Sequence, residues 1–217
     1  MMMANRGLTA KGAATRQRIV DGAAALIRLK GPGATNLDDV LEATATSKSQ
    51  LFHYFPDGRE QLLLAVARYE ADRVLADQQP QLGHLTSWDA WLGWRDAVIA
   101  RYREQGQQCP LNALITQLGR ATPGAQAVVT ELMGQWQAEI AAGVRSMQAS
   151  GEIAADLDPA RTAAAIIAGT QGGVVMMMST GDTTPLEAAL DLAIGYLRAS
   201  PSTAAMNPSG SSRLRVS

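Results

Sequence analysis

Residues 47 to 59 bring together side chains that carry positive charge or form hydrogen bonds. Lys48 is cationic, and Ser49, Gln50 and His53 can donate or accept hydrogen bonds. On one short helix, such side chains can reach phosphates and base edges in a DNA major groove. The positions that we expect to contact DNA are Asn36, Lys48, Ser49, Gln50, His53, Tyr54 and Arg59.

Two short helices joined by a tight turn would position these side chains. The first helix begins after Asn36, a residue type that caps helices. Leu37, Val40 and Leu41 follow at the spacing of one apolar helix face. Residues 45–46 would form the turn, so the segment reads as helix-turn-helix.

The second short helix carries its own start and stop signals. Ser47 and Gln50, three residues apart, form a capping-box pattern. Leu51 and Phe55 are four residues apart and would face inward. Pro56 would end the helix because it lacks a backbone donor and restricts the residue before it.

These segments resemble the helix-turn-helix signature of the tetracycline-repressor (TetR) family. The likeness is carried by Thr-Asn-Leu-Asp-Asp-Val at residues 35–40 and Ser-Lys-Ser-Gln-Leu-Phe-His-Tyr-Phe-Pro at residues 47–56. The entry at residues 31–35 also fits, and the Pro-Asp-Gly-Arg-Glu exit at residues 56–60 carries one residue more than the commoner pattern of the family. A branch of the family that includes drug- and flavonoid-responsive repressors has segments similar to this exit, to Cys-Pro-Leu at 109–111 and to Gln-Gly-Gly at 171–173. The likeness covers most of residues 11–199.

Three positions depart from the pattern of that family. The turn usually carries glycine and then an apolar residue, whereas this chain has Ala45 and Thr46. Phe52 stands where many relatives have a tyrosine that contacts phosphate. The alternative of a helical ligand-binding protein that has lost DNA binding therefore stays open.

Charge is uneven along a chain of 217 residues with a net charge of −1. The first 30 residues contain six basic side chains and one acidic side chain. A local basic region of this kind suits phosphate binding, and its alternative is a solvated helix face. Residues 1–10 and the Ser- and Pro-rich residues 200–217 read as disordered.

The chain offers little for catalysis or metal binding. It has two histidines in unrelated contexts and one cysteine, Cys109, and it has neither a phosphate-binding loop nor a nucleophile elbow. We therefore expect no enzyme activity, no metal site and no cofactor. A single cysteine and the lack of an apolar leader over residues 1–17 favour the cytoplasm.

Helical periodicity recurs along the chain without alternating strand patterns, which predicts an all-α fold of about nine helices. Asp57 with Glu60 would cap the fourth helix, and Thr184 with Glu187 the ninth. We expect a DNA-binding head at 11–57, with the motif at 36–55, and a ligand-binding and dimerisation body at 58–199. The remaining helices are expected near residues 11–30, 88–105, 110–119, 123–150 and 159–180.

Tryptophans mark the predicted body. Trp88 and Trp91 share a helix face, and Trp94 is expected to lie round the helix from both. Any one of them could be core, yet one could line a cavity, and the family resemblance implies a pocket for a small apolar or aromatic effector. The positions expected to line it are Trp91, Trp94, Asn112, Thr116, Met133 and Trp136.

Small residues recur every four positions in the eighth predicted helix, at Ala164, Ala168 and Gly172. Such rows let another helix approach closely, and the alternative is a central helix of one subunit. The resemblance implies that the last two helices form a dimer interface, with Leu190 and Leu197 on the ninth. The hypothesis is therefore a cytoplasmic homodimeric repressor that binds a palindromic operator and leaves it when an effector binds.

Overall fold

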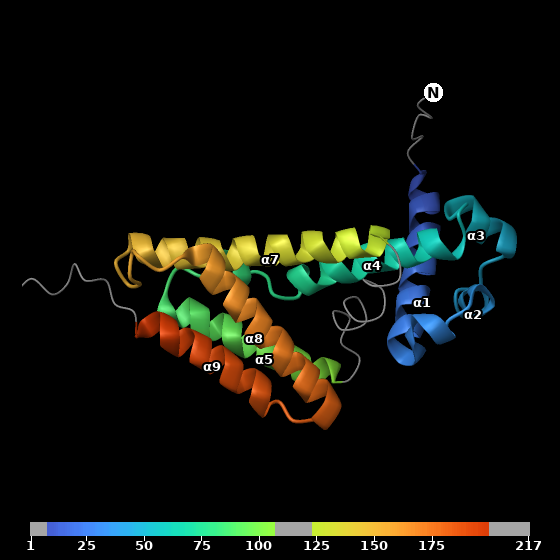
Figure 1. Cartoon of the computed structure of the whole chain (residues 1–217). Coiled ribbons are helices and arrows are strands. Elements are labelled where there is room, and N and C mark those ends of the chain that lie inside the picture. Colours follow the sequence, from blue (N-terminus) through green and yellow to red (C-terminus); the bar gives the residue numbers. More distant parts are fainter. Residues whose placement is uncertain (1–7, 107–122, 200–217) are drawn as a thin grey trace, which may run out of the picture. The chain divides into compact units, whose positions relative to one another are not determined.

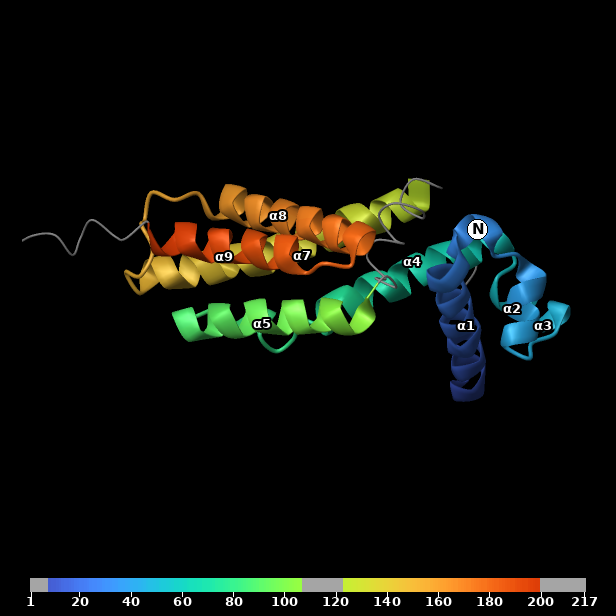
Figure 2. The ribbon, with the colours of Figure 1, turned by 90° about the horizontal axis from the view of Figure 1, so that it is seen from below.

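The computed structural model describes residues 8–106 and 123–199 (Figures 1 and 2). Within these residues the chain forms eight α-helices and one 3-10 turn, and no β-strand. The predicted all-α fold is confirmed. The helix expected near residues 110–119, with Asn112 and Thr116, lies outside the described residues.

The chain divides into two compact units. The first comprises residues 1–79, 100–136 and 178–181, and the second comprises residues 80–99, 137–177 and 182–217. Three helices contribute residues to both units: α5 (Trp88–Gln105), α7 (Pro123–Ala149) and α8 (Pro159–Thr180).

In the first unit, α1 (Ala10–Ala34) packs against α2 (Leu37–Ala43) and α4 (Arg59–Ala76). The α3 helix (Lys48–Tyr54) lies beside them in both views (Figures 1 and 2). Gly31 interrupts α1 at a φ of 79°, a conformation that glycine adopts without a steric penalty. The apolar core of these helices includes Ile19, Val20, Ala23, Ile27, Val40, Leu51, Phe55, Leu62 and Val66.

The start of α4 differs from the prediction. Asp57 does not cap the helix with Glu60; Gly58 is the N-cap residue, at a φ of 63°, and provides no side-chain cap. The Gln61 side chain instead accepts a hydrogen bond from the backbone N–H of Asp57. The glycine conformation shifts the helix start by one residue, so the expected capping pair does not form.

The second unit begins with the 3-10 turn η1 (Leu82–His84) and part of α5. Its helices α8 and α9 (Thr184–Arg198) lie side by side (Figure 1). A Cβ atom at Gly173 would lie 2.5 Å from the Leu186 Cα, so only glycine permits this approach. One at Gly169 would lie 3.7 Å from the Ala189 Cβ. Gly173 is therefore required for the packing of α8 on α9, whereas a Cβ atom at Gly169 would make an ordinary van der Waals contact.

The N-terminus of α9 also corrects the prediction. Thr183, rather than Thr184, is the N-cap residue, and it makes no side-chain cap. Its hydroxyl donates to the Glu187 carboxylate over 2.6 Å, while Asp182 accepts hydrogen bonds from the backbone and hydroxyl of Thr184. The Glu187 backbone N–H donates to the Thr183 carbonyl, so the expected capping pair of Thr184 and Glu187 does not form.

The α8 helix is long and apolar enough, by length and composition, to cross a membrane. Its apolar side chains are, however, part of a folded helical unit: Ile166, Ile167 and Val174 are buried there. The core helix of a folded protein meets the same criteria of length and composition.

Candidate DNA-binding surface and effector region

The turn between α2 and α3 has an unusual backbone at Ala45, whose φ is 45°. Thr44 and Thr46 flank it, both are buried, and their hydroxyl oxygens lie 2.9 Å apart in a hydrogen bond. The Thr44 hydroxyl also donates to the Val40 carbonyl over 2.6 Å. The two threonines thus satisfy their own polar groups inside the turn.

Two residues of helix α1 contact this turn. A Cβ atom at Gly22 would lie 2.2 Å from the Thr44 Cγ2, so glycine is needed for the contact. Arg18 donates a hydrogen bond to the Thr44 carbonyl. The sequence pattern did not indicate this contact, because residues 18 and 22 meet the turn only through the tertiary fold.

Both predicted helix caps of the motif are formed. Asn36 accepts from the Asp39 N–H over 2.8 Å, and the Asp39 carboxylate accepts from the Asn36 N–H over 3.0 Å. Ser47 accepts from the Gln50 N–H over 3.2 Å, and the Gln50 side-chain oxygen accepts from the Ser47 N–H over 3.1 Å. Each short helix therefore begins with two satisfied backbone donors.

The Gln50 side chain can therefore cap α3 and contact a DNA base at the same time. Its oxygen is held by the cap, whereas its amide nitrogen projects from an exposed residue and can still donate to a base. A substitution at Gln50 would change both the helix start and any base contact.

Four of the expected DNA-contacting residues on α3 are exposed: Lys48, Ser49, Gln50 and His53. Tyr54 is half-buried, with its ring edge-on to His53 at 4.9 Å between centroids. Leu51 and Phe55 are buried beneath them, as predicted. The helix thus has an apolar inner side and a polar outer side.

Phe52 is the large apolar residue exposed on this helix, at 40% of its surface. One edge of its ring lies against Gly58, where a Cβ atom would be 3.3 Å from the Phe52 Cε1. Without a hydroxyl, this side chain cannot make the phosphate contact attributed to tyrosine in relatives.

Two cations near the motif are occupied by contacts within the chain. Arg59, at the start of α4, donates to the Pro32 carbonyl. Lys30 pairs with Asp39 over 2.6 Å, and this hydrogen bond, with that from the Asn36 N–H, lowers the pKa of Asp39. Both contacts join the end of α1 to the motif or to α4.

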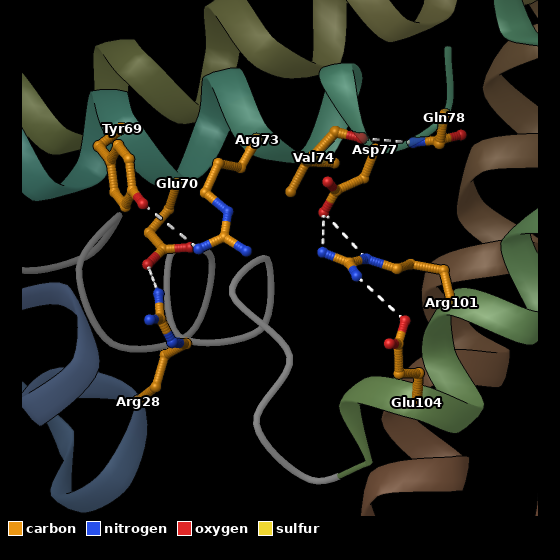
Figure 3. A network of polar contacts seen from close by, with 9 residues as sticks. All are labelled: Arg28, Tyr69, Glu70, Arg73, Val74, Asp77, Gln78, Arg101 and Glu104. Carbon is orange, nitrogen blue, oxygen red and sulfur yellow. Dashed lines mark hydrogen bonds and ion pairs between the residues drawn. The ribbon is translucent and has the colours of Figure 1, made fainter. Parts of the chain in front are cut away.

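A buried ion pair connects α1 to α4 (Figure 3). Arg28 donates to the Glu70 Oε1, and Glu70 is only 2% exposed. Burial raises the pKa of Glu70, although Arg28 and Arg73 act in the opposite direction. Removal from water therefore outweighs the attraction of the two cations at this carboxylate.

A second ion pair joins α4 to the C-terminal part of α5. Arg101 binds Asp77 through two nitrogens, at 2.6 and 3.0 Å, and Glu104 at 3.2 Å (Figure 3). Because α4 contacts both α1 and α5 through charged pairs, it links three helices of the first unit.

The predicted effector-binding tryptophans are all fully buried: Trp91 and Trp94 in the second unit, and Trp136 in the first. Met133 is half-buried. Trp91 and Trp94 pack edge-on, with ring centroids 5.9 Å apart, so the expectation that Trp94 lies round the helix from Trp91 was wrong. Residues three apart on an α-helix share a side.

The predicted dimer-contact residues fall into two groups. Ala164, Ala168 and Gly172 are exposed on α8. Leu190 and Leu197 are 1% and 0% exposed, so they belong to the core of the subunit and cannot offer a surface to a second copy. An apolar groove of about 460 Å³ lies between α8 and α9, lined by Thr162, Ala165, Ile166, Gly169, Ala189, Leu192, Ala193 and Tyr196.

Two family descriptions match the sequence. "Bacterial regulatory proteins, tetR family" matches residues 19–66, which contain the helix-turn-helix, and "Tetracyclin repressor-like, C-terminal domain" matches residues 88–193. Among the described residues, no group of three or more histidine, cysteine, aspartate or glutamate side chains could hold a metal ion.

Curated relatives carry the same kind of description. An uncharacterized HTH-type transcriptional regulator of Mycobacterium tuberculosis (H37Rv) is 34% identical over 110 residues, or 48% of this chain and 53% of the relative. The match thus spans about half the length of that relative. Another such regulator, of Lactococcus lactis, is 26% identical over 191 residues, or 82% of this chain and 90% of its own.

Solved structures share the fold. A TetR transcriptional regulator from Chloroflexus aurantiacus is 29% identical, with a TM-score of 0.77 over 89% of this chain and 98% of that chain. The regulatory protein TetR from Rhodobacter sphaeroides is 20% identical, with a TM-score of 0.71. The match covers 84% of this chain and 97% of that chain.

Proposed function

Because the chain belongs to the TetR family of bacterial transcriptional regulators, we propose that it is a repressor whose homodimer binds a palindromic operator. A small apolar or aromatic effector would release it. The observation that carries the proposal is α3, a helix with a complete N-terminal capping box and with exposed polar side chains over an apolar inner side. A bacterial regulator of this kind would act in the cytoplasm, and its relatives are regulators rather than enzymes.

We assign the expected DNA contacts by the reach and charge of each side chain. Lys48, Tyr54 and Arg59 would position the DNA backbone, and Asn36, beside them in the motif, would cap α2 and touch a phosphate. Ser49, Gln50 and His53 would reach base edges. The two half-sites of the operator would lie roughly 34 Å apart, one head on each.

The rival hypothesis is a ligand-binding protein that has lost DNA binding. Ala45 and Thr46 would favour it if they spoiled the turn, yet Ala45 adopts the left-handed backbone and Thr46 is hydrogen-bonded. The geometry of the motif therefore supports DNA binding. We propose that residues 11–57 form the DNA-binding head and residues 58–199 the ligand-binding and dimerisation body.

The test begins with selection of a binding sequence from random double-stranded DNA, followed by gel-shift titration against the selected and a scrambled duplex. Gln50→Ala should cost about 1–3 kcal/mol on the selected site and relax its sequence preference. Lys48→Ala should weaken both duplexes and flatten the salt dependence.

Ser47→Ala is the matched control for Gln50→Ala, because it removes the other hydrogen bond of the same capping box and leaves the Gln50 amide in place. It should retain sequence preference. Equal losses on both duplexes for Gln50→Ala would remove Gln50 from base recognition, and failure to select any sequence would favour the rival hypothesis.

A further inference from the structure

Three buried N–H groups have no hydrogen-bond acceptor among the described residues: the indole nitrogens of Trp91 and Trp136, and the amide nitrogen of Gln171. Trp91 and Gln171 belong to the second unit, and Trp136 to the first. A buried donor without a partner destabilises the folded protein, and native structures contain few of them. Each of these N–H groups could donate a hydrogen bond to a bound ligand.

Trp91 is the best defined of the three because its ring is fixed on two sides. A Cβ atom at Gly143 would lie 3.2 Å from the Trp91 Cζ2 and 2.5 Å from the Leu85 Cβ, so the indole lies directly against α7. The Trp94 ring stands edge-on to it. Trp91 is 0% exposed, so its N–H cannot turn to water without moving these neighbours.

The surroundings favour a neutral acceptor over an anion. In the described part of the second unit the buried polar residues are Thr162 and Thr170, and no charged residue is buried there. The Thr170 hydroxyl already donates to the Ile166 carbonyl over 2.8 Å. A carboxylate would lose its hydration and meet no buried cation, whereas a carbonyl oxygen needs only a donor.

We propose that the indole N–H of Trp91 donates a hydrogen bond to a carbonyl oxygen of a planar aromatic effector. The proposal rests on the proposed function of the body as an effector-binding unit, and it adds the chemical class of the effector. The flat face of the Trp91 indole matches a planar ring system, and its unpartnered N–H matches one carbonyl oxygen.

The experiment compares ketones with hydrocarbons of the same shape. Calorimetry on the full chain would measure the affinities of fluorenone against fluorene, and of α-tetralone against tetralin. The wild-type protein should bind each ketone about tenfold more tightly than its hydrocarbon, equivalent to about 1.4 kcal/mol. Trp91→Phe should reduce this ratio to about one and change hydrocarbon affinity little.

Trp94→Phe is the control, since Trp94 is equally buried and its indole nitrogen is not among the unpartnered groups. It should keep the ketone preference. Without ligand, Trp91→Phe should unfold at a temperature no lower than Trp94→Phe, because it removes an unmet donor.

Three results would overturn the proposal: a ketone preference that survives in Trp91→Phe, no saturable binding of either ketone, or a lower unfolding temperature for ligand-free Trp91→Phe than for Trp94→Phe. The last would mean that the chain itself supplies the acceptor. Gel-shift titration with ketone separately tests release, so a failed release with intact ketone preference would count only against the proposed switch.

Discussion

Ala45 is the non-glycine residue with a positive φ among the described residues, and it occupies the turn of the helix-turn-helix. A left-handed backbone costs an L-residue with a Cβ atom roughly 1–2 kcal/mol. The buried pair Thr44 and Thr46 on either side compensates through mutual hydrogen bonding. The turn therefore keeps its shape with a residue that is not suited to it.

Ala45→Gly should accordingly stabilise the protein. Relief of strain of about 1–2 kcal/mol exceeds the roughly 0.4–1 kcal/mol by which glycine stabilises the unfolded chain, so a net gain of about 0.5–1 kcal/mol is expected. Urea unfolding followed by circular dichroism would measure it. Ala43→Gly, at a helical position of α2, is the control and should lose about 0.5–1 kcal/mol. A loss for Ala45→Gly would refute the strain argument.

Residue-scale features could be predicted where both partners are close in sequence. The caps at Asn36 and Ser47 were foreseen because each partner is three residues away. The burial of Glu70 was not, since its partner Arg28 is 42 positions earlier and each looks like an ordinary surface charge in the sequence. Gly22 was missed for the same reason: its neighbour, Thr44, comes from another helix.

At the scale of elements, helix ends with a glycine or proline signal were predictable, and competing caps were not. Gly151 follows the end of α7 at a positive φ, as its type suggests, whereas Gly31 only interrupts α1, which was expected to end there and continues to Ala34. At the starts of α4 and α9, Gly58 and Thr183 are the N-cap residues, so the expected capping pairs do not form. Local pattern alone does not say which of two adjacent capping residues prevails.

The pair between α1 and α4 makes an electrostatic prediction about Glu70. Because burial raises its pKa in the folded protein above the ordinary value of 4.5, the folded state takes up the proton at a higher pH than the unfolded state. Wild-type stability relative to Glu70→Gln should therefore rise as pH falls through the folded pKa towards 4.5. That gain should be lost as pH rises.

Urea unfolding of wild type and Glu70→Gln between pH 7 and pH 4.5 would test this. At pH 7 the two should differ by about 1 kcal/mol or less, because a buried ion pair is often no better than a neutral replacement. Arg28→Ala should lose more, about 3 kcal/mol, since it removes the cation that is hydrogen-bonded to the buried carboxylate. A stability difference that is flat with pH would contradict the assignment.

At the scale of the whole molecule, α8 and α9 expose apolar side chains. Leu192 and Tyr196 are 76% and 56% exposed beside the groove, and Val175 and Met176 are about half exposed on α8. Exposed apolar patches of this kind on a soluble protein mark contact surfaces. That α8 and α9 form the dimer contact stays a prediction. The sequence assigned Leu190 and Leu197 to that contact, and both are buried inside the subunit, because the last helix is apolar on its core side too.

Gly172→Trp should therefore convert a dimer into a monomer. A Cβ atom at Gly172 meets nothing within 4 Å inside the subunit, so the indole would fit the protomer and obstruct only a second copy on α8. Gly134→Trp is the matched control, because Gly134 on α7 is equally open. Light scattering should show a dimer for wild type and Gly134→Trp and a monomer for Gly172→Trp, with unchanged helical content in all three. Operator affinity should fall with the dimer, because one head binds one half-site. A persistent Gly172→Trp dimer would place the interface elsewhere.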